Sequence, residues 1–213
     1  MSVLEIKYMN YITFRERFHD FACFSIEQAA AAFPGFSRRN YLSWLRKGYI
    51  KRLRRSWYAF ADAASLSGIG EYFAGKIYSP SYLSCEQVMA RFGLIPESVV
   101  QYTSVTSLKT ESFKNDFGEF FYRSVKPRLM FGYRIETVGD GLPVLIATPE
   151  KALCDFLYLN PQYDTKDEIE ALRLDPDVLA EISADGRLDS VAARFDSQAL
   201  NRRLELVKEV YSL

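Results

Sequence analysis

The sequence predicts an α+β protein with two unlike parts, a basic N-terminal domain and an acidic C-terminal domain. Up to Asp62 the chain holds 11 Lys and Arg against five Asp and Glu, and the remainder holds 16 against 22. The net charge of zero therefore conceals +6 on one part and −6 on the other. Hydrophobic residues make up 48% of the 213 positions, which is enough for a folded core. We expect domains over residues 1–62 and 71–213, joined by the short polar segment 62–70.

The sequence pattern of the N-terminal part predicts three helices. Residues 1–21 have apolar positions at helical spacing that we expect to be buried: Ile6, Tyr8, Met9, Ile12, Phe14, Phe18 and Phe21. Ser25 is a good N-cap for a second helix, with Gln28 in the place of a capping-box partner and Pro34-Gly35 as its end. Ser37 caps a third helix, which Gly48 ends.

A basic two-stranded ribbon is expected directly after the third helix. Lys51–Leu53 and Trp57–Phe60 are strand-like and flank the turn residues Arg54, Arg55 and Ser56. Short helices followed by a ribbon are the order of elements in a winged helix-turn-helix. We therefore predict this fold for residues 1–62, followed by a mixed α/β domain with a mostly antiparallel sheet and a helical tail.

The charge pattern indicates what the N-terminal domain binds. Eight Lys and Arg lie between Arg38 and Arg55, with no Asp or Glu among them. Guanidinium groups at the start of a recognition helix can read base edges, and those of a wing can neutralise phosphates or enter a minor groove. The alternative is a solvated basic surface on an ordinary helical hairpin. The residues expected to contact duplex DNA are Ser37, Arg38, Arg39, Asn40, Tyr41, Trp44, Lys47, Lys51, Arg52, Arg54 and Arg55, although Tyr41 and Trp44 could instead pack inward.

The C-terminal part alternates between helical and strand patterns. We expect a helix from Glu71 to about Ile77, and a second helix that starts at Ser79-Pro80-Ser81 and ends at Gly93. Strands are expected over residues 101–108, 117–124, 129–138 and 142–147, with a hairpin turn at residues 139–141. Thr148 caps a further helix, in which Lys151 and Asp155 are spaced for an i,i+4 ion pair. Residues 165–213 are expected to be helical, with a break at residues 175–177 and a last apolar stripe of Leu200, Leu204, Val207 and Val210.

The sequence predicts no catalytic residue, no metal site and no cofactor. Its three cysteines have no CxxC spacing and are expected to be buried thiols in a reducing cytoplasm, and the chain has one histidine. A metal-dependent nuclease needs clustered carboxylates with a nearby lysine, but the single Glu-x-Lys is Glu5-Ile6-Lys7 in the first expected helix. Glu119 and Glu136 stand isolated among aromatic residues. No signal peptide and no apolar run of 18 residues occur, so no membrane partner is expected.

Four ordered blocks carry a family resemblance: IYSPSYLSCEQVMARFGLIPE, YTSVTSLKT, GEFFYRSVKPRLMFGY and ATPEKALCDFLYL. This succession resembles the AbiEi family, the antitoxin regulators of type IV toxin–antitoxin systems in bacterial abortive infection. The resemblance covers roughly residues 24–159. It implies repression of the protein's own promoter through inverted repeats, with self-association on DNA, and neutralisation of a nucleotidyltransferase-type toxin without necessarily binding it.

Another function remains open for the C-terminal domain. A winged-helix regulator without a toxin could use it to sense a ligand or to form oligomers. The aromatic residues of the expected strands could line a pocket, although they are more typical of a packed core: Phe117, Phe120, Phe121, Tyr122, Phe131 and Tyr133.

Overall fold

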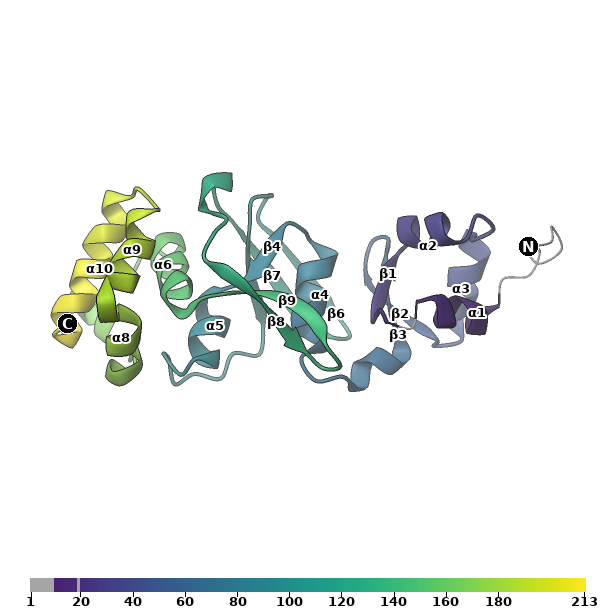
Figure 1. The fold of residues 1–213 in the computed structure, drawn as a ribbon, viewed down its shortest axis with the longest axis horizontal. Helices are drawn as coiled ribbons and strands as arrows, with labels where there is room; N and C mark the ends of the chain where they lie inside the picture. The colour runs from purple at the N-terminus through teal and green to yellow at the C-terminus, as the bar shows by residue number, and fades with distance from the viewer. Residues whose placement is uncertain (1–9, 19) are drawn as a thin grey trace.

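The computed structural model describes residues 10–18 and 20–213, which form an elongated molecule with three parts in a row (Figure 1). At one end, three helices pack against a three-stranded sheet. A six-stranded sheet lies in the middle, and a group of helices that ends the chain lies at the other end. We refer to the described residues up to Asp62 as the N-terminal unit and to residues 71–213 as the C-terminal unit.

The N-terminal unit alternates short helices and strands. Its elements are α1 (Tyr11–Arg17), β1 (Cys23–Ser25), α2 (Ile26–Ala32), α3 (Arg38–Arg46), β2 (Ile50–Arg54) and β3 (Trp57–Phe60). The three strands form an antiparallel sheet in the order β1-β3-β2. The expected ribbon is present, and the Ser25–Gln28 capping box forms as predicted. β1 was not predicted, because three residues are too few to show an alternating pattern.

The first helix is shorter than the sequence indicated. Asn10 caps it by accepting a hydrogen bond from the Thr13 N–H at 2.8 Å. Phe14 and Phe18 are buried as predicted, but Ile12 is 67% exposed and Phe21 is 47% exposed, so the prediction for these two was wrong. Phe21 lies beyond the helix end, where the helical spacing no longer applies. The predicted positions Ile6, Tyr8 and Met9 lie outside the described residues.

The three-stranded sheet has a different neighbour on each face. One face carries Phe24, Tyr58 and Phe60, which join Phe14 and Trp44 of the helices in an aromatic cluster. Successive strand residues point to opposite faces. The opposite face therefore carries Cys23, Leu53 and Ala59, and these residues belong to the hydrophobic core of the C-terminal unit. The sheet thus contributes to a hydrophobic core on each face, since the C-terminal unit packs on the face away from the helices.

The six-stranded sheet has the strand order β6-β7-β5-β4-β9-β8. Its strands are β4 (Ser81–Leu83), β5 (Tyr102–Thr106), β6 (Glu111–Asn115), β7 (Gly118–Ser124), β8 (Tyr133–Val138) and β9 (Leu142–Ala147). β4 pairs with β9 in parallel and β5 pairs with β7 in parallel, whereas the other neighbours are antiparallel. The protein is therefore an α+β fold with mixed sheets that are mostly antiparallel. The predicted strands at β5, β7 and β9 are confirmed, and residues 139–141 make the expected turn between β8 and β9.

The predicted helix start at Ser81 was wrong, because residues 81–83 form the central strand β4. Both edges of β4 pair with neighbours, Leu83 with Ser104 of β5 and with Ile146 of β9. The proline and serines before it indicated a helix cap, but pairing on both sides holds this segment extended. The helix α5 (Cys85–Arg91) begins only after Ser84. The short 3-10 turn Ala61–Ser65 leads from the N-terminal unit toward the helix α4 (Ile69–Ile77), with which the C-terminal unit begins.

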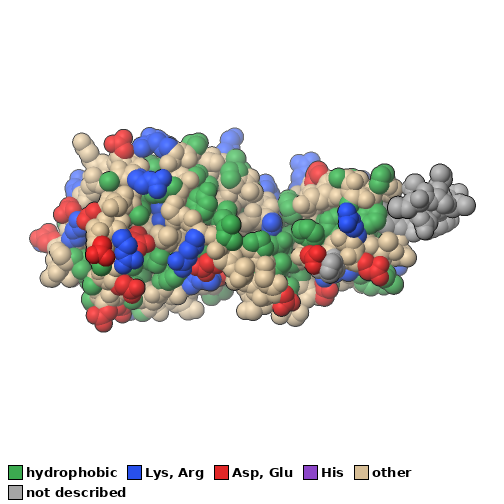
Figure 2. Space-filling view, in the orientation of Figure 1, with side chains coloured by type: hydrophobic (Ala, Val, Ile, Leu, Met, Phe, Trp, Pro, Cys, Tyr) green, Lys and Arg blue, Asp and Glu red, His purple; other side chains and the backbone are tan. Residues whose placement is uncertain are grey.

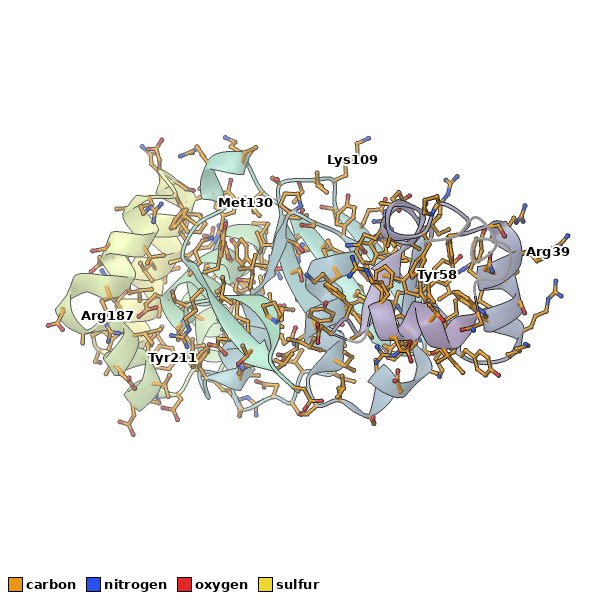
Figure 3. All side chains as sticks on the ribbon, turned by 45° about the vertical axis from the view of Figure 1, so that its right-hand side comes forward. Arg39, Tyr58, Lys109, Met130, Arg187 and Tyr211 are labelled. Carbon is orange, nitrogen blue, oxygen red and sulfur yellow. The ribbon has the colours of Figure 1, made fainter. Side chains whose placement is uncertain are left out.

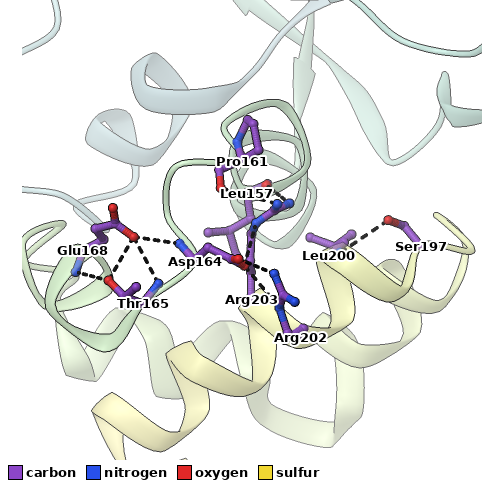
Figure 4. A network of polar contacts seen from close by, with 9 residues as sticks. All are labelled: Leu157, Pro161, Asp164, Thr165, Glu168, Ser197, Leu200, Arg202 and Arg203. Carbon is purple, nitrogen blue, oxygen red and sulfur yellow. Dashed lines mark hydrogen bonds and ion pairs between the residues drawn. The ribbon is translucent and has the colours of Figure 1, made fainter.

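Five helices end the chain: α6 (Pro149–Leu159), α7 (Lys166–Glu170), α8 (Pro176–Ser183), α9 (Arg187–Ala193) and α10 (Gln198–Tyr211). Thr148 caps α6 as predicted, Ser197 caps α10, and Leu200, Leu204 and Val207 of the expected stripe are buried. Arg203 ties α10 to the end of α6, since its guanidinium donates to the Leu157 carbonyl at 3.2 Å and lies 3.5 Å from an Asp164 carboxylate oxygen (Figure 4). This buried arginine was not singled out from the sequence.

Candidate nucleic-acid interface

The helix α3 presents an outward face of basic side chains. Tyr41, Trp44 and Leu45 point inward and pack against the aromatic cluster. The exposed side chains of the helix lie at its two ends. Four exposed cations lie there, which we call the α3 basic face: Arg38, Arg39, Arg46 and Lys47. Figure 3 shows Arg39 pointing away from the protein at the end of the N-terminal unit.

The α3 basic face is not neutralised within the described chain. In residues 10–18 and 20–213, no carboxylate pairs with any of its four cations. Lys47 has a weak contact, with its Nζ 5.8 Å from the centre of the Tyr49 ring. Exposed guanidinium and ammonium groups without an acid nearby attract anions, and their attraction is screened by salt.

Two other predicted residues of α3 stabilise the helix start. Asn40 Oδ1 accepts hydrogen bonds from the Ser37 N–H at 3.0 Å and from the Ser37 hydroxyl at 2.8 Å. Both side chains are therefore used in the cap, which fixes where Arg38 and Arg39 begin the helix.

The predicted aromatic residues of α3 pack inward. Trp44 is only 5% exposed and its ring centre lies 4.7 Å from that of Phe14, so it lies inside the unit. Tyr41 is partly buried and packs 5.3 Å from Tyr58.

The cations of the ribbon are divided between solvent and the C-terminal unit. Arg52 and Arg55 are exposed, and the Arg52 guanidinium lies 6.0 Å over the Tyr58 ring. Arg54 instead donates to the Ile77 carbonyl at 2.8 Å and lies over the rings of Tyr78 and Phe113, at 4.8 and 4.3 Å.

Lys51 also reaches the C-terminal unit. Its Nζ lies 3.2 Å from an Asp116 carboxylate oxygen and 5.8 Å from the Phe117 ring centre. In the same region, the Asn115 side chain donates to the Leu53 carbonyl at 2.9 Å. Lys51 and Arg54 therefore join the two units, so the structure does not bring them together with the α3 basic face.

The structure adds residues that the sequence analysis did not select. Arg46 lies seven positions after Arg39, two helical turns along the same side, and this spacing could have identified it. A shallow cleft lies beside the α3 basic face, lined by Arg39, Ser43 and Lys47 from α3 and by Asn10, Tyr11 and Ile12 from the start of α1. The α1 residues have no basic signal of their own, so only the packing of α1 beside α3 reveals them.

A second polar cluster lies inside the C-terminal unit. Lys151 and Asp155 of α6 are both fully buried and form the predicted ion pair. The hydroxyls of Tyr82 and Ser84 donate to the other Asp155 oxygen at 2.9 and 2.7 Å, and Lys151 Nζ donates to the Tyr82 hydroxyl at 2.8 Å. The rings of Phe131 and Phe195 lie 4.7 and 4.4 Å from the same Nζ.

Burial dominates the protonation of this cluster. Removal from water lowers the pKa of Lys151 and raises the pKa of Asp155, because each charged form loses its hydration. The attraction between the two groups opposes both pKa shifts, and the hydroxyl groups that donate to Asp155 oppose the rise of its pKa. Every polar atom of the pair has a partner inside the protein, which is the arrangement of a structural ion pair.

A cavity with a volume of about 860 Å³ opens beside β6 and β7. Its walls include Glu86, Glu97 and Glu119, the side chain of Tyr163 and an apolar floor with Met89. None of the six aromatic residues proposed for a pocket lines it, and Phe120, Tyr122 and Phe131 are buried in the core. The packed core, which the sequence analysis favoured over a pocket, is therefore the arrangement of these three side chains.

Other features of the described residues bear on chemistry. Cys23, Cys85 and Cys154 are buried free thiols as predicted, and burial raises the pKa of Cys23 to about 12. Within residues 10–18 and 20–213, no group of three His, Cys, Asp or Glu is placed to hold a metal ion. No helix in that part of the chain combines the length and apolar character needed to cross a bilayer.

In comparisons with known proteins, neither a family model nor a curated protein matches the chain.

Proposed function

We propose that the N-terminal unit is a winged helix-turn-helix that binds duplex DNA. The observation that carries this proposal is the α3 basic face, four exposed cations that no described carboxylate neutralises, on the helix directly before a β-ribbon. In such folds the second helix of the motif lies in the major groove and the ribbon contacts the backbone. The net charge of +6 up to Asp62 also favours a polyanionic partner.

Each exposed cation has a role in this arrangement. Arg38 and Arg39 would reach base edges at the start of α3, where a guanidinium can donate two hydrogen bonds to guanine. Arg46 and Lys47 would neutralise phosphates farther along the groove. Arg52 and Arg55 in the ribbon would touch the backbone or the adjacent minor groove. Lys51 and Arg54 would hold the ribbon against the C-terminal unit and contribute less to DNA affinity.

The four-block resemblance extends this proposal to a biological role. The protein would repress its own promoter in the bacterial cytoplasm by binding inverted repeats. It would act as the antitoxin of an AbiE-like type IV operon, neutralising a nucleotidyltransferase-type toxin. The C-terminal unit would serve this second role without catalysis and without a cofactor.

Binding of a labelled fragment of the protein's own promoter tests the DNA interface. Arg38→Ala/Arg39→Ala is expected to weaken binding by about 30-fold or more, since each base-contacting arginine contributes about 1–3 kcal/mol. Lys109→Ala/Lys126→Ala is the matched control, because it removes the same charge from exposed positions of the C-terminal unit. Equal affinities for the two variants would disprove the assignment of the α3 basic face.

The antitoxin role needs a separate experiment. Co-expression with a nucleotidyltransferase encoded beside this gene should restore growth that the enzyme alone prevents. Arg38→Ala/Arg39→Ala should rescue equally well at matched protein levels, because the antitoxin role is assigned to the C-terminal unit. Absence of rescue by the wild-type chain would refute the antitoxin role and leave the DNA interface standing.

The large cavity favours a second candidate, a regulator whose C-terminal unit senses a ligand. A volume of about 860 Å³ lies in the range of small-molecule sites. A ligand of that kind should raise the melting temperature of the protein and change its promoter affinity. A ligand panel that alters neither quantity would favour the antitoxin over the sensor.

A further inference from the structure

The strand β8 is an edge strand with an exposed apolar side chain at its centre. β9 is its only strand neighbour in the part of the chain that the structure describes. Ile135 is 70% exposed, although it is a large aliphatic residue in the middle of a strand. An edge strand offers a row of unpaired N–H and C=O groups, which a further strand can accept.

The exposed isoleucine belongs to a larger apolar face. Cross-strand pairs place Ile135 opposite Leu145 and Thr137 opposite Pro143, all on one face of the β8–β9 hairpin. Tyr133 continues the row and stacks on Tyr82 with ring centres 4.8 Å apart. Figure 2 shows hydrophobic side chains gathered in the middle of the molecule, over this hairpin.

The opposite face of β8 carries charges in a self-complementary order. Arg134 and Glu136 flank Ile135. Arg134 Nε donates to one oxygen of its own Glu136 at 2.9 Å, and Arg91 of α5 donates to the other at 2.7 Å. If a second β8 runs antiparallel with its Ile135 opposite this Ile135, each Arg134 lies opposite the other copy's Glu136. On the apolar face the same register sets each Tyr133 opposite a Thr137, an aromatic pair with a β-branched residue, which favours association.

We propose that β8 is a dimerisation strand, which pairs antiparallel with β8 of a second copy around a two-fold axis at Ile135. The pairing would join two six-stranded sheets into one and bury the two Ile135 side chains against each other. Charged residues on an edge strand usually prevent such pairing by setting like charges opposite each other. Here the register sets opposite charges together, so the charges favour one partner, a second copy of this chain, in one orientation.

The other edge of the sheet does not have this property. Antiparallel pairing of β6 around Phe113 would set Ser112 opposite Lys114 and Glu111 opposite Asn115, with no opposite-charge pair. Asn115 already donates to Leu53 of the N-terminal unit. The N-terminal unit therefore reaches the end of β6, whereas Tyr133, Arg134 and Ile135 of β8 are all exposed.

Disulfide trapping tests the proposed register in the full-length protein. Ile135→Cys should form a dimer under mild oxidation, because directly opposite Cβ atoms lie about 5 Å apart, near the span of a disulfide. Thr137→Cys is the matched control on the same face of the same strand. Its counterpart in the second copy would lie four residues away, about 13 Å, which is too far. The native thiols are all buried, so they do not compete.

Sedimentation equilibrium of the unmodified protein and of a charge variant provides a second readout. Arg134→Glu should weaken the dimer about tenfold, because it sets like charges opposite each other at two symmetric places. A wild-type protein that stays monomeric, or equal trapping by Ile135→Cys and Thr137→Cys, would overturn the proposal. These outcomes are independent of DNA, so they do not depend on the proposed DNA interface.

Discussion

Basic side chains have opposite surroundings at two places in this protein. On α3, Arg38, Arg39 and Arg46 are exposed and no described carboxylate pairs with them. In the C-terminal unit, Lys151 is fully buried and its ammonium is bound by Asp155 and the Tyr82 hydroxyl. A cation in water keeps its hydration and can exchange it for a ligand. A buried cation has lost its hydration and depends on its protein partners.

The basic side chains of the ribbon are intermediate in burial, so the cations of the protein can be ordered from fully buried to fully exposed. Arg54 is partly buried against two rings, and Lys51 forms an exposed ion pair. The loss of unfolding free energy on removing a charge should therefore fall in the order Asp155, Arg54, Lys51, Arg46. The loss of DNA affinity should be greatest at α3, the end of this series where stability changes least.

The largest loss of stability is expected at the buried pair. Asp155→Ala should lower the unfolding free energy by about 3–5 kcal/mol, because it leaves Lys151 charged and buried without its carboxylate. Lys151→Met/Asp155→Asn should be less destabilised, since no charge is left uncompensated and the new amide oxygen can still accept from the Ser84 hydroxyl. Urea denaturation of both variants measures the difference. A double variant less stable than Asp155→Ala would contradict this account.

An intermediate loss is expected at the contact between the units. Arg54→Ala should lower the unfolding free energy by about 1–2 kcal/mol, because it removes a hydrogen bond to Ile77 and stacking on Tyr78 and Phe113. Its promoter affinity should change far less than that of Arg38→Ala/Arg39→Ala.

Arg54→Met is the matched control, because it keeps the apolar stem and removes only the charge and the hydrogen bond. Loss of promoter binding in Arg54→Ala, with stability intact, would place Arg54 in the DNA interface instead.

A small effect is expected at the exposed ion pair. A double-mutant cycle of Lys51→Ala and Asp116→Ala should give a coupling of about 0.2–1 kcal/mol that decreases as salt is added. Thermal denaturation at low and high salt measures it. A coupling that is insensitive to salt would mean that the pair is less exposed than its geometry indicates.

The smallest change in stability is expected on α3. Arg46→Gln should alter the unfolding free energy by no more than about 0.5 kcal/mol, because the side chain is exposed and unpaired with any described acid. If Arg46 contacts a phosphate, the slope of log affinity against log salt should decrease in magnitude by about 0.9. An unchanged slope would remove Arg46 from the interface.

The sequence predicted elements best where local chemistry decides them. Ser25 with Gln28 and Thr148 each marked a helix start that the structure has, because a cap is satisfied by residues within one turn. The hairpin between β8 and β9 was predicted for the same reason, from turn residues flanked by strand-like runs. Failures occurred where long-range pairing prevailed, as at Ser81, where the two neighbours of β4 come from more than 20 residues away along the chain.

By itself the sequence determined the charge division, the basic run, the helix caps and the Lys151–Asp155 spacing, because these depend on residue type and local period. Only the tertiary structure decided which cations of the run stay in solvent and which join the C-terminal unit. It also decided that Ile135 lies exposed on an edge strand. The reason is physical: burial and partners depend on segments that are distant in the chain, and a local pattern contains no information about which segment will pack against it.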